Sequence, residues 1–83
     1  MTNQPITKLK DGLITATIWK NQTSAGKDHY SVTFARSYMK DDEWSESYSF
    51  SGSELLRISR LSQAAYTEIQ KQKRATVEVH AVN

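Results

Sequence analysis

Residues 13–20, LITATIWK, alternate in character from one position to the next. One alternate set is wholly aliphatic and consists of Ile14, Ala16 and Ile18. The other set carries two hydroxyls and an indole and consists of Leu13, Thr15, Thr17 and Trp19. Because successive side chains of a strand point to opposite faces, the stretch predicts a β-strand with one apolar face and one hydroxyl-rich open face that carries Trp19.

Two more alternating runs follow this strand. Residues 21–28, NQTSAGKD, are typical of a turn and lead into HYSVTFARSYMK at 29–40, after which KDDE at 40–43 is a second polar turn. The run WSESYSFS at 44–51 alternates again. These segments predict an antiparallel meander over residues 11–51. Residues 1–10 form an N-terminal arm or an edge strand, and Pro5 suits either position because neither needs its missing N–H.

The period changes at Ser51, where the sequence Ser51-Gly52-Ser53-Glu54 fits a capping box. A helix is predicted over 52–74, with residues 75–83 as a tail or a short strand. Its packing stripe is Leu55, Ile58, Leu61, Ser62, Ala65, Tyr66 and Ile69, and its reverse side is Arg57, Arg60, Ala64, Glu68 and Lys71. The predicted fold is α+β: a curved antiparallel sheet of three to four strands followed by one C-terminal amphipathic helix.

The chain has 83 residues and no cysteine, which suits one domain over residues 1–83 and excludes disulfides, thiolate zinc sites and cysteine nucleophiles. A domain this small is expected to oligomerise. No window reaches the length of an apolar membrane span, and the first residues lack a signal-peptide pattern, so a cytoplasmic location is expected.

His29 and His80 lie far apart, and Asp41, Asp42 and Glu43 suit a turn. No metal, cofactor or enzymatic activity is therefore expected.

Charge is distributed unevenly around the net value of +2. Residues 41–56 contain no Lys or Arg, and their acidic residues are Asp41, Asp42, Glu43, Glu46 and Glu54. The segments on either side are both net basic. A basic region in a nearly neutral protein is compatible with a polyanionic partner, but such a region is more often an ordinary solvated surface.

Seven of the eight aromatic residues lie in the predicted sheet, interleaved with Lys20, Lys27, Arg36 and Lys40. Aromatic rings beside basic side chains are typical of proteins that bind single-stranded nucleic acid. A sheet covered by a helix also needs bulky core residues, and Val32, Phe34, Tyr48 and Phe50 are assigned to that core by their spacing. Trp19 is assigned to the open face, where it is a candidate stacking residue.

The segment from Asp28 to Leu61 resembles the positive-cofactor-four transcriptional coactivators. The likeness rests on the hairpin HYSVTFARSYMKDDEW, the strand ESYSFS and the helix opening GSELLRISRL, and it extends over residues 8–70. It is strongest toward the phage and bacterial homologues, which bind single-stranded DNA. The resemblance implies a homodimer whose protomers hold DNA on the outer surface of a curved sheet through basic and aromatic side chains.

Several residue roles follow from this resemblance. Arg36-Ser37-Tyr38-Met39 aligns with an Arg-x-Tyr-Trp segment of the family, which implies a DNA contact for Arg36. Met39 replaces the family's stacking tryptophan, so stacking falls to Trp19, Tyr38 or Trp44. The expected nucleic-acid-binding residues are Trp19, Lys20, Lys27, Arg36, Tyr38, Lys40 and Trp44. Arg36 and Tyr38 share the spacing of Val32 and Phe34. They therefore reach the DNA side only through a β-bulge near Ala35 or on a strand end open on both faces.

Two functions of different class fit these observations. The first is a non-enzymatic single-stranded DNA-binding protein of replication, recombination or transcription, with little sequence specificity and tolerance of duplex DNA or RNA left open. The second is a small protein–protein interaction module without nucleic-acid binding. Salt dependence separates them, because binding to phosphates weakens as salt rises.

Overall fold

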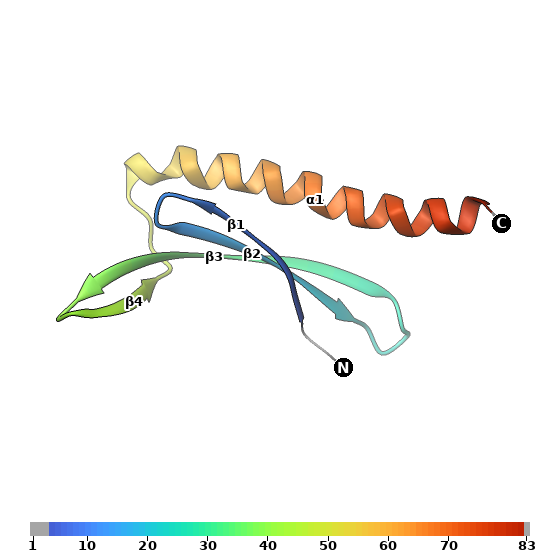
Figure 1. Cartoon of the computed structure of the whole chain (residues 1–83), viewed down its shortest axis with the longest axis horizontal. Helices are drawn as coiled ribbons and strands as arrows, with labels where there is room; N and C mark the ends of the chain where they lie inside the picture. The colour runs from blue at the N-terminus through green and yellow to red at the C-terminus, as the bar shows by residue number, and fades with distance from the viewer. Residues whose placement is uncertain (1–3, 83) are drawn as a thin grey trace.

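The computed structural model describes residues 4–82, with side chains described for residues 4–74. This part of the chain forms a sheet followed by a helix (Figure 1). Its elements are β1 (Gln4–Asp11), β2 (Ile14–Gln22), β3 (Asp28–Lys40), β4 (Glu43–Ser47), a 3₁₀ turn (Gly52–Glu54) and α1 (Leu55–Val82). The strands are antiparallel in the order β1-β2-β3-β4, which confirms the predicted fold, and residues 4–10 belong to an edge strand.

β3 is the longest strand and curves through the sheet (Figure 1). It pairs with β2 along residues 28–36 and with β4 along residues 36–40. Asp41 and Asp42 form the tight turn between β3 and β4, with φ angles of 51° and 64°. Aspartate is among the few residues with a side chain that visit this left-handed region readily. The KDDE segment at 40–43 therefore forms the tip of a hairpin, as the sequence predicts.

The core lies between α1 and one face of the sheet, because the helix packs mainly on β1 and β2 and less on β3. The buried residues are Ile14, Ala16, Ile18, Leu61 and Ala65. Three of the residues assigned to the core from the sequence, Val32, Phe34 and Phe50, stay partly exposed and pack against the cluster formed by Ile14, Ala16 and Leu61. The aliphatic set of β2 thus faces the helix, and Trp19 lies on the opposite face.

Tyr48 is not a core residue, and its assignment from the sequence is wrong. Its side chain is 71% exposed. The serine alternation continues to Ser51, but β4 ends at Ser47, where the Ser47 hydroxyl accepts a hydrogen bond from the Ser49 N–H at 3.2 Å. Such local bonds compete with the sheet ladder. Once the chain leaves the sheet, strand spacing no longer decides which way a side chain points.

The helix is preceded by the predicted cap, in which the Ser51 N–H donates to Glu54 Oε1 at 2.8 Å. It ends at Val82 rather than at residue 74, so residues 75–82 are helical instead of a tail or a strand. They contain no Gly or Pro that would stop a helix, and Asn83 lies outside the described residues. No helix within residues 4–82 is long and apolar enough to cross a membrane.

Arg57 and Arg60 do not lie on a side of α1 turned away from the sheet, contrary to the sequence prediction. Both bind Asp11 at the end of β1, and Arg60 Nη2 lies 3.0 Å from Asp11 Oδ2. Gly12 permits this contact: its φ is 65°, and a Cβ there would lie 3.1 Å from Arg57 Nη1. The β1–β2 turn therefore meets the first turns of the helix.

Candidate nucleic-acid interface

The open face is the sheet face opposite α1. Strand register places on it every side chain that alternates with the core set of β2. Its main members are Lys8, Lys10, Thr15, Thr17, Trp19, Thr33, Ala35, Ser37, Met39, Trp44 and Glu46. The centre of this face has small hydroxyl-bearing or methyl side chains, and the larger groups stand around them.

The open face contains a first depression, called the Trp19 hollow. Thr17, Thr33 and Ala35 form its floor on the two central strands. Pro5 and Lys8 border it from β1, Trp19 stands on β2, and Glu46 and Tyr48 border it from β4 and the segment after β4. The Trp19 indole is fixed in place, because its Nε1–H donates to Thr33 Oγ1 at 2.9 Å.

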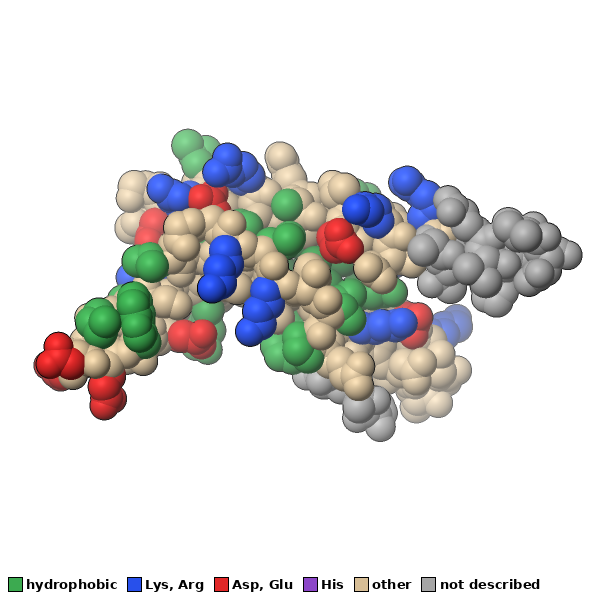
Figure 2. All heavy atoms as spheres, in the orientation of Figure 1, with side chains coloured by type: hydrophobic (Ala, Val, Ile, Leu, Met, Phe, Trp, Pro, Cys, Tyr) green, Lys and Arg blue, Asp and Glu red, His purple; other side chains and the backbone are tan. Residues whose placement is uncertain are grey.

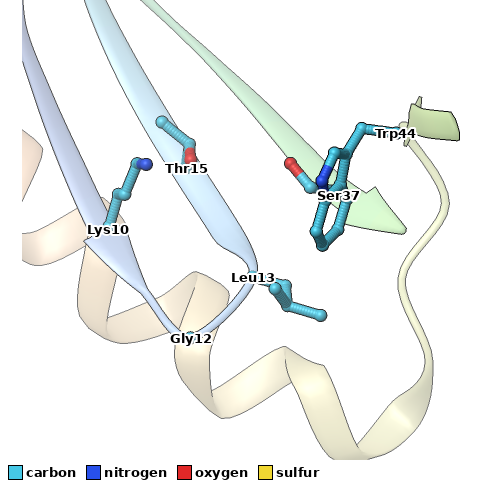
Figure 3. Close-up of a pocket in the computed structure, with 6 residues that line it drawn as sticks. All are labelled: Lys10, Gly12, Leu13, Thr15, Ser37 and Trp44. Carbon is cyan, nitrogen blue, oxygen red and sulfur yellow. The ribbon is translucent and has the colours of Figure 1, made fainter. Parts of the chain in front are cut away.

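A second depression, called the Trp44 hollow, lies beside the β1–β2 turn. Its lining residues are Lys10, Gly12, Leu13, Thr15, Ser37 and Trp44. Figure 3 shows Lys10 and Trp44 on opposite sides of Thr15 and Ser37, with the helix behind the sheet. The Trp44 side chain is 64% exposed although it is aromatic.

The two hollows share one arrangement. Each has a lysine from β1 on one side, small side chains in the middle and an aromatic side chain from the β4 side. Lys8 and Lys10 are exposed, and neither makes an ion pair with any described side chain. Free cations beside aromatic rings and hydroxyls can hold a phosphate while a base stacks. Figure 2 shows acidic side chains at the tip of the β3–β4 hairpin, at one end of the molecule.

Arg36 and Tyr38 lie on the helix side of the sheet. The β2–β3 register runs without a shift from the Ile14–Arg36 pair to the Gln22–Asp28 pair, so no bulge reverses β3 near Ala35. Arg36 Nε lies 3.4 Å from Glu54 Oε2, and its guanidinium lies over the Tyr38 ring at 5.7 Å. Arg36 therefore connects β3 to the start of the helix.

The remaining expected lysines are dispersed. Lys20 is on the helix side and pairs with Asp28 at 3.5 Å. Lys27 is exposed in the β2–β3 loop, and Lys40 is exposed at the β3–β4 turn. Of the seven residues expected from the sequence, the structure places Trp19 and Trp44 on the open face, each in a different hollow.

Three basic or aromatic residues that line the hollows are absent from the set expected from the sequence: Lys8, Lys10 and Tyr48. A signal for the two lysines exists in Lys8-Leu9-Lys10, where basic residues alternate with the apolar Leu9 as in a half-buried strand. Tyr48 had no such signal, because it follows the end of β4.

Comparisons with protein-family models, with curated proteins and with solved structures find no match for this chain. Among the described side chains, no three His, Asp or Glu residues come together as a candidate metal site.

Proposed function

We propose that this protein binds single-stranded DNA on its open face and acts as a non-enzymatic accessory protein of replication, recombination or transcription. The observation that supports the proposal is the repeated arrangement of the two hollows, each with an unpaired lysine opposite an aromatic side chain. Lys8 and Lys10 would hold successive phosphates, and the bases would lie over the hydroxyl-bearing floor against Trp19, Tyr48 and Trp44. Stacking and phosphate contacts make little demand on sequence.

The proposal is restricted to the open face. Arg36 and Tyr38 remain on the helix side, and Arg36 is engaged with Glu54. Trp44 on β4 takes the stacking role proposed for this end of the sheet, because it pairs in register with Met39 near the end of β3. Met39 is the residue that stands where the resembling family has its stacking tryptophan. A tryptophan on the neighbouring strand would supply the ring at nearly the same place.

The experiment that tests the function is a fluorescence-anisotropy titration of a labelled single-stranded oligonucleotide at several salt concentrations. The logarithm of the association constant is expected to fall linearly with the logarithm of the salt concentration, by about 0.7 per phosphate contacted. A protein-interaction module without nucleic-acid binding is the competing function. Absence of binding at low salt, or binding that does not respond to salt, would favour that alternative.

The second part of the proposal is that the protein is a homodimer. An apolar groove runs between β3 and α1 and is lined by Val32, Phe34, Ser62, Ala65, Tyr66 and Ile69. The Tyr66 side chain is 66% exposed there. Next to it, the outer edge of β3 over residues 28–35 pairs with no described strand. Unpaired strand edges and exposed apolar surface are both stabilised by a second chain.

A further inference from the structure

The charges on the open face are separated across the strands. Its lysines, Lys8 and Lys10, both stand on β1, at one edge of the sheet. Its carboxylate, Glu46, stands on β4, at the other edge. If single-stranded DNA lay on this face, its phosphates would be attracted to the lysines at the β1 side and repelled by Glu46 at the β4 side. The phosphates would follow β1, and the bases would point toward β4.

Glu46 borders the Trp19 hollow and is absent from the lining of the Trp44 hollow. No described lysine or arginine pairs with it, and the Tyr48 hydroxyl donates to its Oε1 at 3.4 Å. That contact is long and leaves most of the acceptor capacity of the carboxylate unused. A carboxylate in this position is suited to accept hydrogen bonds from the edge of a base.

We infer that Glu46 determines base preference in the Trp19 hollow by accepting a hydrogen bond from a base amino group. Cytosine carries an amino donor at position 4, and carboxylate side chains are established acceptors for that group. Uracil and thymine carry a carbonyl oxygen there, which a carboxylate repels. The inference rests on the proposed function and adds a selection for amino-bearing bases to a surface that is otherwise tolerant of sequence.

The test compares oligo(dC) with oligo(dU), each about 12 nucleotides long, which is within the range that one small binding domain covers. Cytosine and uracil have the same ring size and differ at the edge that Glu46 would meet, so stacking is matched. At neutral pH the wild-type protein is expected to bind oligo(dC) about tenfold more tightly, which is the lower end of what one charge-assisted hydrogen bond contributes. Affinities are measured by anisotropy at one low salt concentration.

Glu46→Gln is the decisive variant. An amide can donate to the uracil carbonyl as well as accept from the cytosine amino group, so the ratio of the two affinities is expected to fall to about one or two. Most of that change is expected from tighter binding of oligo(dU). The exposed position of Glu46 lets the variant fold as the wild type does, which circular dichroism checks.

Glu43→Gln is the matched control, because it removes the same charge from the same strand. Glu43 pairs in register with Lys40 and lies on the helix side. It should leave the preference for oligo(dC) unchanged. Equal wild-type affinities for the two oligonucleotides, or a preference that survives in Glu46→Gln, would overturn the inference while leaving the proposed function in place. Failure of the wild type to bind either oligonucleotide would overturn both.

Discussion

At the scale of single residues, Trp19 is held in position before a ligand arrives by its hydrogen bond to Thr33. An ordered ring loses little side-chain entropy when a base stacks on it. Trp19→Ala is expected to weaken binding of single-stranded DNA by about 1–3 kcal/mol at every salt concentration, with the salt slope unchanged. Anisotropy titrations at several salt concentrations measure the affinity and the slope together.

The matched control is Trp19→Phe, which keeps an aromatic ring while losing the donor to Thr33. It should retain most of the stacking energy, because stacking needs only the face of the ring. A Trp19→Ala protein that binds as tightly as wild type would show that no base stacks in the Trp19 hollow.

Lys8 and Lys10 are expected to act through charge, in contrast to Trp19. Lys8→Ala and Lys10→Ala should each make the salt slope shallower by about 0.7, because one fewer phosphate is neutralised. Lys20→Ala is the control, since Lys20 lies on the helix side and pairs with Asp28. If Lys20→Ala changed the slope while the β1 variants did not, the phosphates would follow the opposite face.

At the scale of elements, the start of α1 depends on Glu54. The hydrogen bond from the Ser51 backbone N–H, helped by the nearby charges of Arg36 and Arg57, holds the pKa of Glu54 below its ordinary value of 4.5. A lowered pKa stabilises the folded state above about pH 4.5, and this stabilisation disappears as the pH falls through the folded-state pKa. Glu54→Gln should therefore lower the melting temperature at neutral pH, with the difference from wild type narrowing in acid.

Thermal unfolding followed by circular dichroism at neutral pH and in acid measures this difference. Glu43→Gln serves as the comparison, because Glu43 is exposed at the hairpin turn and lies outside the cap. A difference between wild type and Glu54→Gln that stayed constant into acid would contradict a role for the ionised carboxylate.

The junction between β1 and α1 depends on Asp11. Its side chain is 11% exposed and forms ion pairs with Arg57 and Arg60. Both arginines are half exposed or more, which limits the value of each pair. Asp11→Ala is expected to lower the free energy of unfolding by about 1 kcal/mol, measured by urea denaturation. The double variant Arg57→Ala/Arg60→Ala should be similarly destabilised and still bind DNA. If the double variant lost DNA binding while Asp11→Ala kept it, the DNA-binding surface would lie on the helix instead.

The elements that could be predicted from the sequence are those that keep one period throughout. β2 repeats its aliphatic set without interruption, and this fixed Trp19 on the open face. The end of β4 could not be predicted, because the Ser47–Ser49 hydrogen bond ends the strand while the alternation continues. Arg57 and Arg60 show a second limit: helical spacing places them on one side of α1, but only the path of the β1–β2 turn brings Asp11 to them.

At the scale of the whole molecule, the sheet separates two surfaces of different composition. The open face carries the hollows proposed to bind DNA, and the helix side carries the core and the apolar groove. The molecule is elongated, with extents of 55 × 27 × 17 Å. Because the groove and the hollows lie on opposite faces, dimerisation through the groove would leave the DNA surface uncovered.

Tyr66→Lys tests the dimer, because it places a charge in the apolar groove at a side chain exposed enough to be replaced without unfolding the protomer. Sedimentation equilibrium at micromolar concentration should give twice the chain mass of 9.5 kDa for wild type and a single chain mass for the variant. Leu56→Lys is the control, since Leu56 is 82% exposed and lies beside Arg57 and Arg60 outside the groove. A wild-type mass near 9.5 kDa would contradict the dimer.

The same variant links oligomeric state to DNA binding. A dimer presents two open faces. A DNA strand long enough to reach both would bind the second face intramolecularly, at a high effective concentration. Tyr66→Lys should therefore bind a short oligonucleotide with wild-type affinity and a long one at least about tenfold more weakly than wild type. Anisotropy titrations with the two lengths measure this difference. Equal weakening at both lengths would instead mean that the groove, rather than the open face, contacts the DNA.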